Sequence, residues 1–98
     1  MEKEYKYLRS SLESVVNATE RITSWNIAHE IWAIKCYTKL SQGYLDKLKQ
    51  IEANWSKINL DKINTKLNLI SVFSNDALNS LWSIKLYAQE CLKLLLSE

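Results

Sequence analysis

Proline is absent from the sequence, and Gly43 is the single glycine among 98 residues. These two residue types supply the fixed and left-handed backbone conformations of tight turns, so their scarcity argues against a turn-rich β protein. Long helices joined by few turns are the economical alternative. Long apolar runs are missing too: none approaches the roughly 20 residues that span a bilayer, and the N-terminus lacks an apolar signal core. We therefore expect an all-α, cytoplasmic protein without a membrane segment.

Groups with catalytic or metal-binding chemistry are also few. His29 is the only histidine, so no pair of histidines exists for a metal or a proton relay. Cys36 and Cys91 lack metal or redox spacing, and their apolar helical neighbours predict buried thiols in a reducing compartment. The acidic residues follow no motif, and no glycine-rich loop is present to hold phosphate. We expect no metal, no cofactor and no enzymatic activity.

The residues that are present suit one helical domain spanning 1–98. Hydrophobic residues make up 47% of the chain, which is typical of a globular protein, and the net charge of +2 is too balanced to imply a polyanion partner by itself. Four tryptophans and five tyrosines are many for this length. Such residues serve equally as core anchors and as interface residues.

Apolar residues recur every three or four positions along most of the chain, as in amphipathic helices. The first helix reads Tyr5, Leu8, Leu12, Val15, Thr19 and Ile22. Thr23 and Ser24 supply a turn and an N-cap, and a second helix starts at Ile27. A firm break follows at 59–61, where the apolar stripe shifts by roughly 100° around the helix. Residues 74–76 then start a last helix that runs to about Ser97.

The second helix admits two interpretations because it contains Gly43. Gly43 either ends the helix as a C-cap, or lies inside a helix that continues to about residue 58. The unbroken phase of the apolar stripe favours continuity. The pattern predicts an antiparallel four-helix bundle, or five helices if Gly43 breaks the second one.

Two stretches fifty positions apart, 32–37 and 82–87, repeat Trp, Ile, Lys and Tyr at the same spacing. They indicate matching helices and leave open a duplicated helical hairpin. In one interpretation both helices bury the same face, with each lysine extending past a tryptophan that it contacts by a cation–π interaction. In the other, the two Trp/Lys pairs form a binding surface. Aromatic stripes at helical spacing are usually core, which favours the first interpretation.

The last helix is apolar over most of its circumference, including Leu86 and Leu94 on the side that should face water. Such a helix is either central in a bundle or covered by a second copy. Because a central helix is hard to arrange in a small protein, we expect a homodimer with this helix in the interface.

The expected function is a small non-catalytic protein–protein interaction module of the adaptor, inhibitor or immunity type. The residues expected at the binding face are Trp25, Trp32, Lys35 and Lys39, together with Trp82, Lys85, Leu86 and Leu94. The alternative is nucleic-acid binding by the lysine-rich segment 35–66, with Tyr44 and Trp55 stacking on bases. The scarcity of arginine and the scattered directions of the lysines make this the weaker interpretation.

Overall fold

The computed structural model describes residues 2–51 and 57–96. The helices are α1 (Glu2–Arg21), α2 (Ile27–Ile51), α3 (Lys57–Phe73) and α4 (Ala77–Leu96), with the 3₁₀ turn η1 (Ser74–Asp76) between α3 and α4. Within these described ranges no strand is present, so the prediction of an all-α protein is confirmed. The molecule is elongated, with principal dimensions of 44 × 20 × 19 Å.

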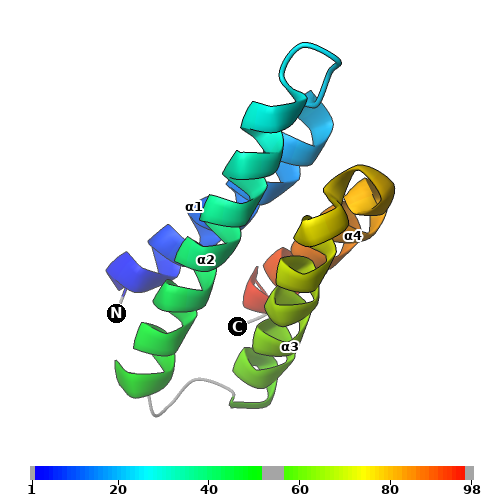
Figure 1. Cartoon of the computed structure of the whole chain (residues 1–98). Coiled ribbons are helices and arrows are strands. Elements are labelled where there is room, and N and C mark those ends of the chain that lie inside the picture. The colour runs from blue at the N-terminus through cyan, green and yellow to red at the C-terminus, as the bar shows by residue number, and fades with distance from the viewer. Residues whose placement is uncertain (1, 52–56, 97–98) are drawn as a thin grey trace.

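Successive helices run in opposite directions along the long axis of the molecule (Figure 1). Helix α1 packs against α2 and α4, and α3 packs against the same two helices. Helices α2 and α4 therefore lie diagonally across the described assembly, each touching both of the others. Residues far apart in the chain meet across this arrangement, as where the Tyr5 hydroxyl donates to the Leu95 carbonyl oxygen at 3.5 Å.

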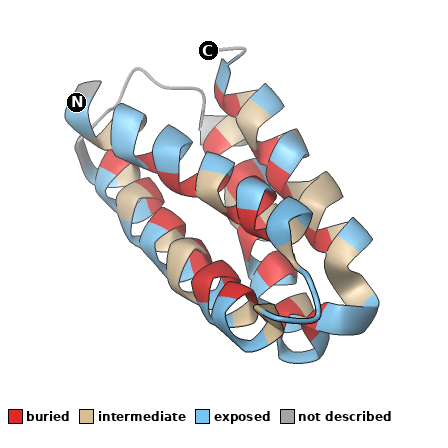
Figure 2. Cartoon of the chain, turned by 90° about the horizontal axis from the view of Figure 1, so that it is seen from above, coloured by how far each residue is buried: buried red, intermediate tan, exposed pale blue. Residues whose placement is uncertain are grey.

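The core is a single apolar seam along the axis of the molecule, and Figure 2 shows the buried residues turned inward on every helix. The three-four alternation expected for the first helix is confirmed, because Leu8, Leu12 and Val15 have no exposed surface. The other fully buried large side chains are Ile34, Leu45, Leu48, Ile63, Leu67, Ile70, Ile84, Cys91 and Leu95. Burial of such aliphatic side chains stabilises the fold by about 1.5–3 kcal/mol each.

Helix α2 passes through Gly43 without interruption, and Gly43 has no left-handed backbone conformation. A helix break at Gly43 is therefore wrong, and the continuous interpretation holds as far as Ile51. Its predicted continuation toward residue 58, including Trp55, falls partly on 52–56, outside the described residues. The break predicted at 59–61 is wrong, because α3 already begins at Lys57. Leu60 and Ile63 are both buried, so 59–61 lies within the core-facing part of α3.

The turn between α1 and α2 depends on Asn26, which occupies the position before the first residue of α2. Its Oδ1 accepts the Thr23 backbone N–H at 2.7 Å, and its Nδ2 donates to the Arg21 carbonyl oxygen at 3.0 Å. Its own carbonyl oxygen accepts the Glu30 N–H at 2.9 Å, which opens the α2 hydrogen-bond ladder. The turn lies where it was predicted, but Asn26 rather than Ser24 stands at the helix start.

The junction at 74–76 also lies where the sequence indicated, although its chemistry differs. The chain keeps right-handed helical dihedrals through the 3₁₀ turn, from Phe73 to Ala77. The Ser74 hydroxyl donates back to the Ser71 carbonyl oxygen at 2.7 Å, and the Asp76 carboxylate accepts the Asn79 side-chain amide at 3.0 Å. Ser74 thus ends α3 instead of capping α4.

Candidate interaction surface along helix α2

Trp32 and Trp82, the tryptophans of the two repeated stretches that we expect in the core, lie on the surface, and so does Trp25. The exposed fractions are 95% for Trp25, 62% for Trp32 and 74% for Trp82. The interpretation of the two Trp/Lys stretches as core is therefore wrong for the indoles. The core face of α2 is the stripe that contains Ile34, Thr38 and Ser41, and Trp32 lies outside this stripe. Trp32 then points away from the core, about 200° from Ile34 around the helix.

The two stretches do occupy matching environments. Ile34 and Ile84 have no exposed surface, and Tyr37 and Tyr87 pack partly buried against the core. The shared spacing thus predicts shared burial, with the isoleucine inside and the tryptophan two positions earlier outside.

The expected contacts between each lysine and its tryptophan are not formed among the described residues. Lys85 instead approaches Glu20 of α1, with 3.7 Å between Nζ and Oε1. The ring of Trp32 packs beside His29, with 6.0 Å between ring centroids. The lysine–ring contacts that are formed join Lys3 to Tyr7 and Lys66 to Tyr87.

The expected binding residues fall on two sides of the molecule. Trp32 lies on the outer face of α2, with Trp25 in the turn that precedes this helix; Trp82 lies on the outer face of α4. Because α2 and α4 are diagonal, their outer faces point in opposite directions. The structure therefore does not bring Trp32 and Trp82 together into one surface.

The remaining expected residues lie beside these two faces. Lys35 and Lys39 border a polar recess between α2 and α3 that Ser71 and Asn75 also line. Leu86 is half-buried on α4. Leu94, also half-buried, lines a groove between α3 and α4 in which Lys66 Nζ lies 3.0 Å from Glu90 Oε2.

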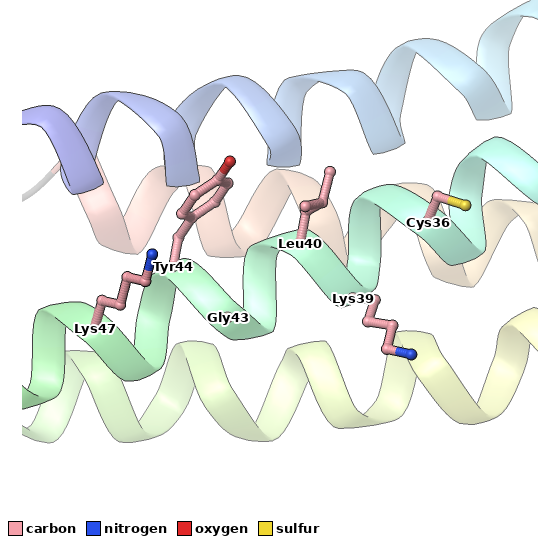
Figure 3. Close-up of a pocket in the computed structure, with 6 residues that line it drawn as sticks. All are labelled: Cys36, Lys39, Leu40, Gly43, Tyr44 and Lys47. Atoms are coloured by element: carbon pink, nitrogen blue, oxygen red, sulfur yellow. The ribbon is translucent and has the colours of Figure 1, made fainter.

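The outer face of α2 carries an open, mostly apolar depression of about 640 Å³, which we call the α2 groove. Its lining residues all come from this one helix: Cys36, Lys39, Leu40, Gly43, Tyr44 and Lys47. Figure 3 shows Leu40 and Tyr44 rising on the side of α1, Lys39 pointing to the other side, and Gly43 between them. The Tyr44 ring is held against Tyr7 of α1, with 5.3 Å between centroids. The groove begins one helical turn after Trp32, so the two form a continuous strip.

Sequence reasoning missed Leu40, Gly43 and Lys47 as surface residues of one strip. The available signal was their spacing from Trp32, since Trp32, Cys36, Leu40 and Gly43 recur every three or four positions opposite the buried face. The same geometry corrects the prediction for Cys36, which is only half-buried because it shares the side of Trp32. Leu40 is 46% exposed.

Cys91 is buried, as predicted, and its environment is inert. Burial raises the pKa of the Cys91 thiol to about 12; the charge of Lys66 lowers this pKa and the charge of Glu90 raises it, both by less than burial does. Its Sγ lies 3.8 Å from the Ile63 carbonyl oxygen. Both cysteines are free thiols. Among the described residues, no cluster of three His, Cys, Asp or Glu side chains could hold a metal ion.

Ion pairs neutralise part of the positive charge of the lysine-rich segment 35–66. Lys49 lies 3.5 Å from Asp61 across the α2–α3 connection, and Lys66 pairs with Glu90. Tyr44, one of the two aromatic residues expected to stack on bases, already packs on Tyr7. The other, Trp55, lies outside the described residues. The lysines of this segment that form no ion pair within the described part of the chain are Lys35, Lys39, Lys47 and Lys62.

Comparison with known proteins adds no relationship: no family model, no curated protein and no solved structure matches this chain. In the described ranges, no helix combines the length and apolarity needed to cross a membrane.

Proposed function

We propose that this protein is a cytoplasmic, non-catalytic protein–protein interaction module of the adaptor, inhibitor or immunity type. In this proposal the helices form an antiparallel four-helix bundle that presents Trp32 and the α2 groove to a partner protein. The free thiols of Cys36 and Cys91 suit a reducing compartment.

The observation that supports the proposal most strongly is the exposure of indole surface at the start of α2. At 95% and 62% exposure, Trp25 and Trp32 leave on the order of 350 Å² of aromatic side chain in water. A standard interface buries about 800 Å² on each partner, so these two side chains alone provide almost half of one. Tryptophan is also among the residue types that dominate binding energy at interfaces.

The outer face of α4 supports the proposed homodimer. Leu78 is 54% exposed, Trp82 is 74% exposed, and half-buried Leu86 follows four positions later on the same side. This i, i+4, i+8 stripe is the kind of apolar face that two copies can cover mutually in an isologous contact. The partner-binding face and the dimer face are then separate, because α2 and α4 point in opposite directions.

The partner proposal is tested by affinity capture from the source cell with matched single substitutions. Trp32→Ala is expected to abolish capture of the partner protein, while Trp82→Ala retains it; thermal melts of both variants stay close to that of the original protein. Equal loss of capture and stability in Trp32→Ala would mean that Trp32 is part of the core. Capture of nucleic acid in place of protein, with salt-sensitive affinity, would support the lysine-rich alternative and overturn the proposal.

The homodimer is tested by size-exclusion chromatography with light scattering. The expected mass is that of two chains at tens of micromolar, and Trp82→Glu is expected to give a folded monomer while Trp32→Glu remains dimeric. A monomer at these concentrations, or dissociation by both substitutions alike, contradicts the assignment of the dimer to α4.

A further inference from the structure

Gly43 has no explanation within the described chain. It is the only glycine in the sequence, it lies in the middle of α2, and its backbone is not left-handed. A Cβ added there would meet nothing within 4 Å. Glycine is less favourable than alanine inside a helix, since it loses more backbone freedom on folding. The fold would therefore be more stable with alanine, and no contact among the described residues requires the missing side chain.

The residues around Gly43 have the spacing of a helix-docking site. In helix packing, one side chain of a partner helix inserts between four residues at positions i, i+3, i+4 and i+7. The α2 groove contains two such sockets that share Leu40 and Gly43, namely 36, 39, 40, 43 and 40, 43, 44, 47. Without a side chain at Gly43 the two sockets merge, and the backbone of an approaching helix can come closer than usual.

Charge identifies the occupant. Lys39 and Lys47 border the groove, and Lys35 lies one turn before Lys39; none of the three forms an ion pair among the described residues. Two copies of α2 crossing at Gly43 would place lysines against lysines, which disfavours a second copy of this chain as the occupant. A helix with acidic residues on its flanks would instead be attracted at both ends of the groove.

We infer that the α2 groove receives an amphipathic helix of the partner protein, with a small apolar residue opposite Gly43 and carboxylates opposite Lys39 and Lys47. This inference rests on the proposed function and specifies its partner. From Cys36 to Lys47 the groove spans about 16 Å, or three turns of the docked helix.

The test uses synthetic helical peptides of about 20 residues, long enough to cover the groove. One peptide carries alanine and leucine on its apolar face with glutamates on the flanks, and a second has every glutamate replaced by lysine. A fluorophore on the N-terminus of each peptide reports binding by polarisation, so that the groove itself stays unmodified. Amide chemical shifts in 36–47 confirm the location.

We expect the glutamate peptide to bind at millimolar concentration or below, with an affinity that falls as salt is added. The lysine peptide should bind at least tenfold more weakly. Gly43→Leu should remove binding and Gly43→Ala should weaken it severalfold, although both variants should melt above the original protein. Asn17→Leu, which adds the same side chain at an exposed position of α1, is the control and should bind normally.

Equal binding of the two peptides, no binding of either, or unchanged binding by Gly43→Leu would overturn the inference. The proposed function is tested separately from this inference, by the natural partner. A natural partner captured through Trp32 whose affinity is unaffected by Gly43→Leu would leave the protein an interaction module and would remove only the acidic helix from the groove.

Discussion

The carboxylate of Glu30 allows a sharp test of how the α1–α2 connection is held. Its side chain is only 7% exposed, and Oε2 is buried without a hydrogen-bond partner among the described residues. Its compensating charge is Arg21, whose Nη2 lies 3.5 Å away and whose side chain is 59% exposed. Glu30 also lies in the first turn of α2, where the helix dipole favours a negative charge.

Arg21→Ala removes the cation and leaves the carboxylate buried. Breaking a fully buried pair costs about 3–5 kcal/mol, whereas a surface pair contributes about 0–1 kcal/mol. Because Arg21 is more than half exposed, solvent screens the pair, and we expect a loss of about 1–2 kcal/mol in the free energy of unfolding. For a chain of this size each kcal/mol lowers Tm by about 4–8 °C.

The opposite result is expected for Glu30→Leu. Replacing a buried charge by an apolar side chain of similar volume is often neutral or stabilising, so this variant should unfold within about 1 kcal/mol of the original. In the background of Glu30→Leu, Arg21→Ala should cost almost nothing, because no buried charge remains to be compensated. Urea unfolding of the four proteins gives the double-mutant cycle. A cost for Arg21→Ala that persists without Glu30 would refute the ion pair as its cause.

Three further outcomes are expected. Cys36 should react with a thiol reagent at pH 8 in the folded protein, while Cys91 reacts only on unfolding; rapid modification of both would contradict the buried position of Cys91. Because folding raises the pKa of Cys91 from 9.0 to about 12, the unfolded chain loses this proton first, so stability present below pH 9 should fall by up to about 4 kcal/mol between pH 9 and 12. Unfolding of the original protein and of Cys91→Ala at each pH isolates this contribution: the loss of stability that Cys91 causes is absent from the variant. Finally, Ser11 and Ser41 have two hydroxyl protons for three contacts, which are their mutual 2.6 Å bond and one backbone carbonyl each. Ser41→Ala should therefore lower the free energy of unfolding by less than about 1 kcal/mol. Ser41→Val should lower it by about 1–3 kcal/mol, because the larger side chain overpacks the contact between α1 and α2. Equal losses for the two variants in urea unfolding would show that this contact is not tightly packed.

Much of the fold could be predicted from the sequence, because the deepest core residues are aliphatic and keep helical spacing. Leu8, Leu12 and Val15 in α1, and Ile84 and Leu95 in α4, lie where their periodicity placed them. Turns at 23–24 and 74–76 could also be predicted from clusters of Ser, Thr, Asn and Asp. The continuity of α2 through Gly43 was favoured by the unbroken stripe, and the structure confirms it as far as Ile51.

The position of the tryptophans could not be predicted in the same way. Thr38 and Ser41 continue the predicted stripe of Ile34, and both are buried in the core face of α2. Their hydroxyl groups are satisfied within the helix by the carbonyl oxygens of Ile34 and Tyr37, which makes burial inexpensive. Trp32 lies nearly opposite this stripe, and only the general tendency of aromatic side chains to be buried favoured a core position for it.

The placement of Trp32 and Trp82 on opposite sides of the molecule could not be predicted from any local sequence pattern. Which helices are diagonal follows from the packing of all of them together, and only this packing shows that Trp32 and Trp82 face in opposite directions. The importance of Gly43 likewise appears only when the space around its missing side chain is known to be open.

The proposed binding surface is tested most directly by the solvent accessibility of single tryptophans, measured by iodide quenching in variants that keep one tryptophan each. Trp32 in the isolated protein should be quenched almost as readily as in the unfolded chain, and partner binding should protect it. An indole at position 32 that iodide cannot reach in the dilute, folded protein would contradict this surface, because the core would then include the face on which it lies.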